Sequence, residues 1–593
     1  MDDRAAALAF LRRHGVGRGD LVGLALAPGT GLGLAVPGAS MPLASGDPAA
    51  VVGVLDADVR PRWVMWSAAQ TAGPLVADGV RLATAWEVAA VHRVLAGGWK
   101  ADAGRAWARV HGLPAAGLPA TGPLDLFSAA EASAVGDDEP LRPDGHLNAA
   151  WVDGVWATGP GTLARWAALA LEVADRQERL LTTLAAGEPT GDPGLDAATG
   201  GPAGPDVALT VARAESAAEL LCAELTADGL PMDRAVAEAI VAAAAGPRPA
   251  TAAEDAALRA RRDAEVLRHA PAGTEADLRS PGQVKALLRR IGVDVPDTRA
   301  WRLEAMREAH PLVDALLTWR KAERMATTFG YAWLDQHLGA DGRLRGAWTG
   351  SDGAAGRMTA SAGLHNMPGD MRPAVVAEAG HLFVRADLGQ VEVRVLAAVS
   401  GDTALARAGG EADMYAPIAA QLGLDRATAK VAVLGAMYGQ TTGHGANALR
   451  RLRAAFPVAM AYLDAADRSG QAGHDLRTHG GRRIRFGVPD PDDRRRAAAM
   501  GRYARNAMVQ GAAAELFKAW SATVRTRLAG HPAQIVLCLH DELLVHTPAA
   551  DAEEVATIVE SSLHAAARHW APTTTTRFVA DIATIPRWSD AKG

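Results

Sequence analysis

The chain has 593 residues, of which 49% are hydrophobic and 22% are charged, and its formal net charge is −6 at pH 7. This balance excludes a disordered chain and a small disulfide-stapled module, and the length allows about three or four domains. No apolar stretch approaches the roughly 20 residues that cross a bilayer, and no secretory signal is readable, so we expect a cytoplasmic protein without a membrane span. Cys222 and Cys538 belong to no Cys-x-x-Cys pair and are expected to be buried small hydrophobic residues.

The first 183 residues predict a mixed α/β domain. Short apolar runs at Leu21 to Leu26 and Trp63 to Trp66 are typical of strands, and they alternate with Ala/Leu-rich helical segments such as Leu163 to Arg179. Residues 185–206 are rich in glycine and proline and lack apolar periodicity, which predicts a linker between this domain and the rest of the chain.

The chain after the linker is rich in predicted helices. Helical patterns cover Ser216 to Leu225 and Gln283 to Arg290, and Ser280-Pro281 supplies the cap and first-turn residues of the second. Strand character returns at His381 to Asp387 and at Gln534 to Thr547, where two apolar runs flank charged residues and predict a hairpin.

Acidic residues stand at the ends of these predicted strands. Asp387 ends the first strand, and His540-Asp541-Glu542 forms the hairpin turn. Taken separately, Asp387 also fits a helix cap and the turn also fits a solvated loop. If Asp387 and Asp541 converge, their oxygen atoms suit two Mg²⁺ ions about 3.5–4 Å apart, the arrangement used for displacement at phosphorus.

A third pattern lies on a predicted helix. Arg426, Lys430, Leu434 and Tyr438 follow one another at intervals of four, so they form one stripe of two cations, an apolar residue and an aromatic ring. No acid stands between the two cations in the sequence, which favours an anionic ligand such as a triphosphate. The alternative is a solvated cationic face whose lower end packs into a core.

These motifs, in this order, resemble the family A DNA polymerases from about residue 207 to the end. The Asp387 segment is similar to the first palm motif, Ser400-Gly401-Asp402 to SGD, the Arg426 segment to the fingers-helix motif and Leu539 to Glu542 to the last palm motif. Further matches are Gly356-Arg357, Leu364 to Pro368, Gly481-Arg482-Arg483 and Asn506 to Gly511.

The resemblance implies roles for the matching residues. Asp387 and Asp541 would hold two Mg²⁺ ions with the Leu388 carbonyl, and Glu542 would assist. Lys430 would donate a proton to the leaving pyrophosphate, and Glu392 would exclude a ribose 2′-hydroxyl. The implied nucleotide-binding set is Arg426, Lys430, Leu434, Tyr438, Glu392 and Gln390. The implied DNA-binding set is Arg357, Asn506, Gln510 and His540 in the minor groove, with Arg482 and Arg483 on phosphates.

The implied fold is α+β and multidomain. An α/β, RNase H-like exonuclease domain (1–184) and the linker (185–206) would precede a right-hand polymerase domain (207–593). The thumb would cover about 230–340, an antiparallel palm about 345–402 and 500–593, and helical fingers about 403–499. The implied function is template-directed DNA synthesis in replication or repair by a monomer that uses primer–template DNA and deoxynucleoside triphosphates.

Several positions depart from the family pattern. The family Phe of the fingers helix is Leu434, Tyr-Ser after the first catalytic Asp is Leu388-Gly389, and Tyr415 stands where the family has His. We therefore expect an active but atypical polymerase with weaker nucleotide affinity or altered selectivity. A single-subunit RNA polymerase shares several of these elements, but Glu392 and Glu542 favour DNA synthesis. A catalytically silent DNA-binding protein with this fold is the other alternative.

The amino-terminal domain lacks the acids of an active 3′–5′ exonuclease. Such an enzyme needs its own carboxylate cluster for two metal ions, opened by Asp-x-Glu on the first strand. No Asp-x-Glu stands there, and Asp175 lacks the family Tyr four residues before it. We therefore expect a degenerate domain without effective proofreading.

Overall fold

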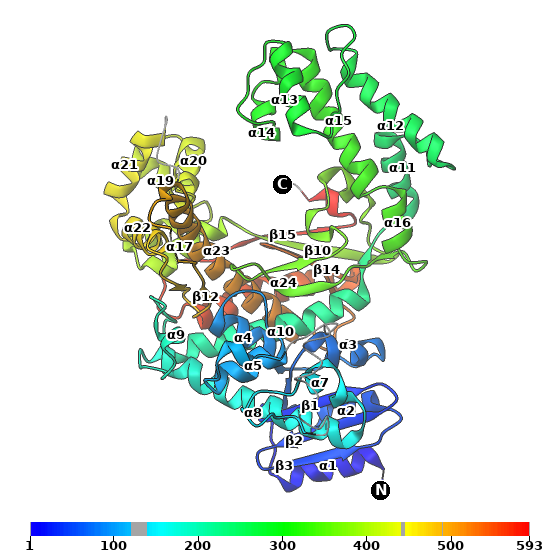
Figure 1. Cartoon of the computed structure of the whole chain (residues 1–593), viewed down its shortest axis with the longest axis vertical. Coiled ribbons are helices and arrows are strands. Elements are labelled where there is room, and N and C mark those ends of the chain that lie inside the picture. The colour runs from blue at the N-terminus through cyan, green and yellow to red at the C-terminus, as the bar shows by residue number, and fades with distance from the viewer. Residues whose placement is uncertain (1, 120–138, 440–444, 489, 592–593) are drawn as a thin grey trace. The chain divides into compact units, whose positions relative to one another are not determined.

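The computed structural model describes residues 2–119, 139–439, 445–488 and 490–591. The chain divides into two compact units. Unit 1 comprises the described residues within Met1–Asp228, Ala347–Thr359 and Phe383–Thr584, and unit 2 those within Gly229–Gly346, Ala360–Leu382 and Ile585–Gly593. Figure 1 labels the elements of both. None of the helices in the described ranges has the length and apolar character required to cross a membrane.

Unit 1 begins with a five-stranded mixed sheet. The strand order is β3-β2-β1-β4-β5. β1 pairs antiparallel with β2 and parallel with β4, and β5 extends the parallel part. This is the α/β arrangement that the sequence predicts. The strands are β1 (Leu21–Ala27), β2 (Gly31–Val36), β3 (Ala39–Leu43), β4 (Arg62–Met65) and β5 (Ala85–Glu87). The helices are α1 (Asp3–Arg13), α2 (Pro48–Asp58), α3 (Ala68–Ala77), α4 (Val88–Ala96), α5 (Ala103–Val110), α7 (Ala149–Asp153) and α8 (Pro160–Ala185).

Two strand glycines allow helix α8 to lie directly on this sheet. A Cβ atom on Gly23 of β1 would stand 2.4 Å from the carbonyl oxygen of Ala167, and one on Gly33 of β2 would stand 2.2 Å from the backbone nitrogen of Ala164. Real Cβ atoms do not approach backbone atoms so closely, so only glycine permits the contact. The stacked rings of Trp66 and Trp166, with centroids 4.7 Å apart, extend the same interface.

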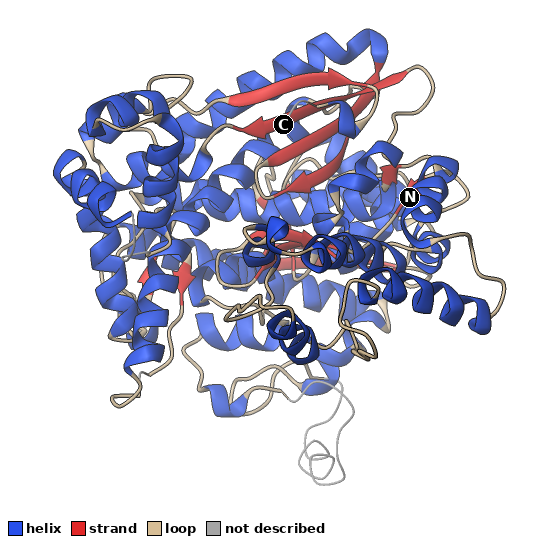
Figure 2. Cartoon of the chain, turned by 90° about the horizontal axis from the view of Figure 1, so that it is seen from above, coloured by secondary structure: helices blue, strands red, loops and turns tan. Residues whose placement is uncertain are grey.

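The rest of unit 1 is built around a four-stranded sheet of order β13-β14-β10-β15, drawn as red arrows in Figure 2. β13 and β14 form an antiparallel hairpin. The strands are β8 (Trp348–Asp352), β9 (Arg357–Ala360), β10 (His381–Leu388), β11 (Leu476–Arg477), β12 (Arg483–Ile484), β13 (Gln534–Leu539), β14 (Glu542–Pro548) and β15 (Ala580–Ile585), with one or two end residues of β9, β10 and β15 assigned to unit 2. The helices are α9 (Pro193–Asp196), α10 (Pro205–Asp228), α17 (Val391–Ser400), α18 (Thr403–Ala408), α19 (Tyr415–Leu422), α20 (Arg426–Met437), α21 (Gly445–Ala455), α22 (Pro457–Gln471), α23 (Arg494–Arg527) and α24 (Ala552–Trp570).

Unit 2 is mainly helical and has its own apolar core, formed by residues such as Leu287, Leu312 and Leu316. Helix α13 begins with Pro281 directly after Ser280, as the sequence predicts, although the Ser280 side chain makes no capping bond. The elements are β6 (Leu230–Pro231), α11 (Arg234–Ala245), α12 (Ala252–Leu267), α13 (Pro281–Arg290), α14 (Ala300–Glu304), α15 (Pro311–Thr328), α16 (Tyr331–His337) and β7 (Arg343–Leu344).

The predicted strands, the hairpin and the helix at Arg426 are all found, and both cysteines are buried without forming a disulfide. The predicted linker contains the short helix α9 and pairs with β11 through Thr199. The Thr199 amide donates to the Asp475 carbonyl at 2.9 Å, and the Arg477 amide donates to the Thr199 carbonyl at 2.8 Å. Backbone pairing therefore holds part of the segment that the sequence predicts as a linker.

Candidate active site

Two acids converge where β10 ends and the β13–β14 hairpin turns. The Leu388 amide donates to the carbonyl oxygen of Asp541 at 2.8 Å, which ties the two segments together. Burial and the negative charge of Asp541 raise the pKa of Asp387 to about 6. Burial and the neighbouring Glu542 raise the pKa of Asp541. The two acids that the sequence predicts to converge therefore lie close enough for their charges to repel.

The sequence did not reveal that an arginine accompanies these acids. Arg385 is buried on β10, two residues before Asp387 and so on the same face of the strand. Its Nη2 donates to Asp387 Oδ2 at 2.9 Å and its Nε to Glu542 Oε1 at 2.8 Å. Its Nη1 donates to Asp581 Oδ2 at 3.2 Å. The guanidinium neutralises part of the acidic cluster, and the alternation of side chains along β10 is the signal that points to it.

The acid pair suits a divalent cation. Two half-buried carboxylates and a backbone carbonyl are hard oxygen donors, and a cation between the carboxylates would relieve the repulsion that raises the pKa of Asp387. Glu542 is held differently. No choice of one oxygen each from Asp387, Asp541 and Glu542 places all three atoms within 4.8 Å of one another. Glu542 instead pairs with Arg385, so the fitting donors are Asp387, Asp541 and the Leu388 carbonyl.

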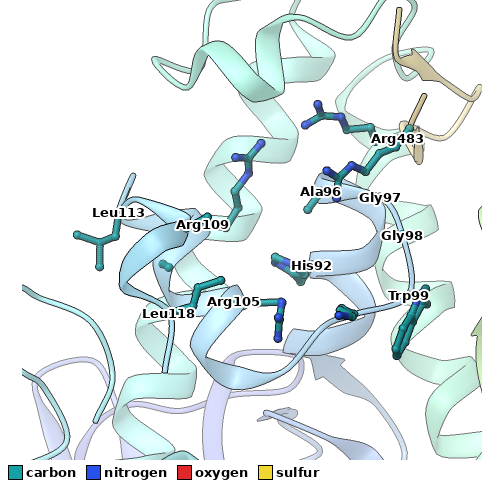
Figure 3. Close-up of a pocket in the computed structure, with 14 residues that line it drawn as sticks. His92, Ala96, Gly97, Gly98, Trp99, Arg105, Arg109, Leu113, Leu118 and Arg483 are labelled. Carbon is teal, nitrogen blue, oxygen red and sulfur yellow. The ribbon is translucent and has the colours of Figure 1, made fainter. Parts of the chain in front are cut away.

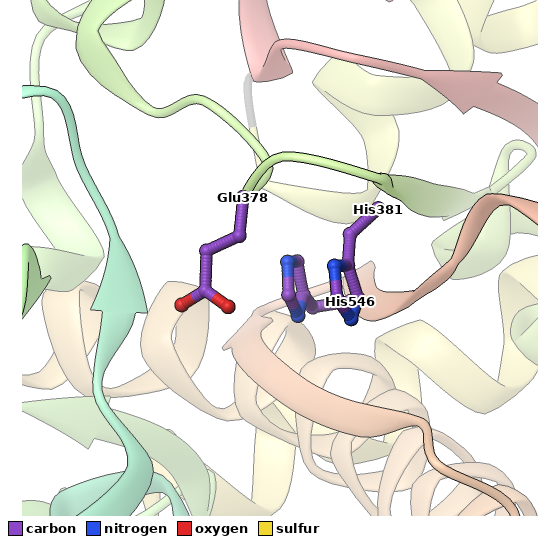
Figure 4. Close-up of side chains that lie close together, drawn as sticks. All are labelled: Glu378, His381 and His546. Atoms are coloured by element: carbon purple, nitrogen blue, oxygen red, sulfur yellow. The ribbon is translucent and has the colours of Figure 1, made fainter.

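Figure 4 shows three other side chains with metal-ligating atoms, Glu378, His381 and His546. Glu378 and His381 belong to unit 2, and His546 on β14 belongs to unit 1. Within its own unit, Glu378 accepts a hydrogen bond from Arg343 Nε at 2.7 Å. The buried His546 ring lies 5.6 Å from the Phe383 ring, measured between centroids. We assign these three residues no role in the candidate active site.

Glu392, on the first turn of α17, joins several predicted site residues. Its Oε2 accepts a hydrogen bond from the Tyr438 hydroxyl at 3.1 Å, and its Oε1 accepts one from Arg357 Nη2 at 3.3 Å. Gln510 of α23 also hydrogen bonds to Tyr438, whose pKa is raised by burial and by Glu392. The structure therefore gathers Arg357, Glu392, Tyr438 and Gln510 from β9, α17, the end of α20 and α23.

Helix α20 presents the predicted stripe, with one addition that the spacing did not predict. Arg426 Nε lies 2.6 Å from Asp413 Oδ2, so an acid from outside the helix pairs with the first cation. Asp413 Oδ1 also accepts from Gln390 Nε2 at 2.8 Å, which links Arg426 to the turn between β10 and α17. Lys430 is exposed and forms no ion pair with any described residue, and Leu434 is half-buried.

Arg394 is a second residue that the sequence analysis missed. Its fully buried guanidinium donates to five backbone carbonyls, those of Gly389, Gly409, Glu411, Ala412 and Arg577. These bonds hold the turn at Gly389-Gln390, where Gln390 has a φ of 55°. The turn sets the directions of Gln390 and Glu392, so Arg394 is a positioning residue of the site.

The predicted DNA contacts have different outcomes. Asn506 is on α23, and its Oδ1 is buried with no hydrogen-bond partner among the described residues. His540 is exposed in the hairpin turn. The prediction that Arg482 contacts DNA phosphates is wrong, because its side chain is 1% exposed and its Nη2 lies 2.6 Å from Glu215 Oε2. Arg483 pairs with Asp475 at 2.5 Å and is largely buried.

Comparison with solved structures supports the fold. The chain superposes on the POL domain of Pol1 from M. smegmatis, solved in complex with DNA primer-template and dNTP, with a TM-score of 0.66 and 20% identity. The match covers 98% of this chain and 97% of that one. The protein therefore has the fold of a polymerase domain over nearly its whole length.

Sequence comparison identifies relatives over about half of the chain. The chain is 32% identical over 299 residues to the thermostable DNA polymerase I of Thermus thermophilus, which covers 45% of this chain and 36% of that protein. It is 28% identical over 370 residues to DNA polymerase I of Deinococcus radiodurans, with 56% and 38% covered. The chain thus spans little more than a third of the length of these relatives. The model of the family described as DNA polymerase family A matches residues 252–589. Because this match takes in more than half of the chain, the protein belongs to DNA polymerase family A.

Proposed function

We propose that the protein is a template-directed DNA polymerase that adds deoxynucleotides to a primer 3′ end by two-metal nucleotidyl transfer. The observation that carries this proposal is the convergence of Asp387 and Asp541 at the end of β10. Two residues of the predicted stripe are hydrogen-bonded to the segment that follows β10, Arg426 through Asp413 to Gln390 and Tyr438 directly to Glu392. The relatives named DNA polymerase I, and the Pol1 structure with primer-template and dNTP, support the same reaction.

In this proposal Asp387, Asp541 and the Leu388 carbonyl would hold two Mg²⁺ ions. Oxygen donors are the ligands that Mg²⁺ prefers, and the bound ions would stabilise charge that develops on the attacking and leaving oxygens. Lys430, exposed and without a carboxylate partner among the described residues, would donate a proton to the pyrophosphate. Arg426 donates two hydrogen bonds to Asp413, and it would donate them to the triphosphate when a nucleotide binds. A guanidinium group can bind either a carboxylate or a phosphate through two parallel hydrogen bonds.

Residues around Glu392 would position the sugar, base and DNA. Glu392, held by Tyr438 and Arg357, would fill the space beside the sugar C2′ and disfavour ribonucleotides. Leu434, Tyr438 and Gln390 would line the nucleotide site. Arg357, Asn506, Gln510 and His540 would contact the minor groove, where the acceptors are common to all correct base pairs. The orphaned Asn506 Oδ1 supports a polar ligand at that position.

We propose that residues 1–184 are a degenerate exonuclease-like domain. β1 carries no carboxylate over its seven residues, and Asp175 on α8 pairs with Arg179. Within residues 2–119 and 139–228 no three His, Cys, Asp or Glu side chains lie close enough to share a metal ion. We also propose the thumb, palm and fingers boundaries given in the sequence analysis. The proposed thumb (about 230–340) lies inside unit 2.

Primer extension with Mg²⁺ on matched and mismatched 3′ termini tests both parts. We expect template-dependent extension of the matched primer and no shortening of the mismatched one. Absence of extension over a wide range of nucleotide concentrations would contradict the polymerase. Removal of the mismatched nucleotide would contradict the degenerate domain.

Replacing Arg385 with Gln should strengthen divalent cation binding. The guanidinium holds Asp387 and Glu542, so its loss leaves the acidic cluster more negative and frees Asp387 Oδ2. We expect Mn²⁺ affinity to rise by about tenfold, the effect of roughly 1.4 kcal/mol of added attraction. Mn²⁺ binding by electron paramagnetic resonance at pH 8 measures this without turnover. Arg407→Gln, on the exposed side of α18, should leave the affinity unchanged. Unchanged or weaker Mn²⁺ binding in Arg385→Gln would contradict the idea that Arg385 competes with the cation for Asp387.

Replacing Glu392 with Ala should reduce sugar discrimination. The change opens the space beside the proposed C2′ position, and we expect the ratio of kcat/KM for dNTP over rNTP to fall by roughly a hundredfold. Glu392→Gln keeps the size and removes the charge, so it should retain most of the discrimination. An Ala variant that discriminates like the parent protein would remove Glu392 from this role.

A further inference from the structure

Unit 1 contains a positively charged pocket whose lining includes none of the candidate active-site acids. It has a volume of about 450 Å³ and is formed by α4, α5 and residues next to β12, all within unit 1. Figure 3 shows Arg105 and Arg109 reaching it from α5, His92 from α4 and Arg483 from β12. The volume is in the range of small-ligand sites.

The lining carries an excess of positive charge. Lys100, Arg105, Arg109, Arg483 and Arg485 face the pocket, and none of its described lining residues is an acid. Three of these cations have partners outside the lining: Arg105 pairs with Asp102, Arg109 with Asp192 and Arg483 with Asp475.

Two of the five cations have no acidic partner among the described residues. Lys100 and Arg485 are exposed and form no ion pair with any residue in the described ranges. Burial and the nearby Arg483 and Arg485 lower the pKa of Arg109. Burial and Arg109 lower the pKa of His92 to about 4, so His92 is neutral at pH 7. An anion would relieve the repulsion among these cations.

The two sides of the pocket are fixed against each other. Gly97 has a φ of +72°, and a Cβ atom there would stand 2.5 Å from the carbonyl oxygen of Arg483, so only glycine allows this approach. Arg477 is buried and donates to the carbonyls of Leu95 and Leu195 at 3.3 and 3.2 Å. These contacts hold the loop after α4 against the β11–β12 hairpin, so the pocket is preformed.

An exposed aromatic ring completes the site. Trp99 follows Gly97 and Gly98, is 68% exposed and lines the pocket (Figure 3). Lys100 Nζ lies 5.3 Å from the centroid of its ring. Exposure of so large an apolar ring carries a cost that a stacked ligand would remove. An aromatic face beside a group of arginines is the combination that binds the base and phosphate of a nucleotide.

We propose that this pocket binds a nucleotide unit, with the base on Trp99 and the phosphate among Lys100, Arg109 and Arg485. Single-stranded DNA and a free nucleotide both offer a base next to a phosphate, so the bound nucleotide unit comes from one of these two sources. Of the residues that the sequence analysis assigns to the polymerase site, Arg483 lines this pocket and the catalytic acids do not. Binding in the pocket therefore does not require polymerase activity.

The test uses the full chain and an oligo-dT labelled with fluorescein and carrying one 5-iododeoxyuridine. Anisotropy measures binding, and photocrosslinking followed by mass spectrometry identifies the contacted peptide. We expect a crosslink in the peptide that contains Trp99. The double variant Lys100→Glu/Arg485→Glu should lose this crosslink, and dTMP binding by calorimetry should weaken by about tenfold or more.

Matched controls separate the pocket from general charge and from other DNA sites. Arg18→Glu changes another exposed arginine, outside the pocket, and Trp301→Ala removes another exposed tryptophan, 61% exposed and beside Arg302. Neither should affect the Trp99 crosslink. Unlabelled oligo-dT and dTMP are compared as competitors of the Trp99 crosslink. If oligo-dT competes at least about tenfold better, single-stranded DNA is the source of the bound nucleotide unit, and if it does not, the free nucleotide is the source. A pocket that binds inorganic phosphate as tightly as dTMP, or crosslinks confined to other peptides, would overturn the proposal.

Discussion

Replacing Asp387 with Asn is expected to abolish primer extension while primer–template binding persists. Asparagine keeps the shape of the side chain but removes the negative charge that the proposed metal ions need. We expect the extension rate to fall by at least about a thousandfold, as for loss of an essential catalytic group. Single-turnover extension measures the rate, and fluorescence anisotropy with a labelled primer–template measures binding.

Asp581→Asn is the matched control for this substitution. Asp581 also contacts Arg385, but its side chain is 68% exposed, so it sits at the outer edge of the acidic cluster. The Asp581→Asn variant should extend the primer at a rate within a fewfold of that of the parent protein. Equal losses in both variants would mean that the overall charge of the cluster matters rather than Asp387 itself. Normal extension by Asp387→Asn would remove this residue from the mechanism.

Local patterns were enough to predict the elements that carry the site. The apolar runs ending at Asp387 and flanking Asp541 are strands in the structure, and the four-residue spacing from Arg426 is a helix. Strand alternation and helical periodicity depend on neighbouring residues, so a single sequence reveals them. The resemblance to family A then indicated which acids would meet.

The partners of the charged side chains could not be predicted in this way. Asp413 reaches Arg426 from the segment before α19, and Arg385 meets Glu542 across neighbouring strands. Both pairs depend on how elements pack, which no local pattern encodes. The resemblance implies phosphate contacts for Arg482 and Arg483, yet Arg482 is buried and pairs with Glu215 of α10. The tripeptide sequence Gly-Arg-Arg is compatible with either an exposed or a buried arginine.

That buried partner carries the second large prediction, a loss of stability in Glu215→Gln. Glu215 is 2% exposed, and its Oε2 lies 2.6 Å from both Arg482 Nη2 and Lys518 Nζ. These contacts join α10 to α23 and to the segment before β12. Glutamine would remove the carboxylate that contacts both buried cations. Removing one partner of a buried ion pair costs about 3–5 kcal/mol of unfolding free energy. The midpoint of urea unfolding measures the loss.

The pH dependence of this loss distinguishes charge from packing. Burial lowers the pKa of Lys518 from 10.5 to about 8, and Glu215 partly opposes that shift. Without Glu215 the folded-state pKa of Lys518 falls further below its unfolded value, so the folded variant releases this proton at a lower pH than the folded parent protein does. The burial cost of the Lys518 charge is therefore relieved at lower pH in the variant than in the parent. The loss of unfolding free energy in Glu215→Gln should therefore become smaller as pH rises from about 7 to about 9. It should not disappear, because Arg482 stays charged. Glu188→Gln, the same change at an exposed position, should stay within about 0.5 kcal/mol of the parent protein. A deficit that is independent of pH would assign the effect to lost packing, and no deficit at all would show that the Glu215 charge is dispensable.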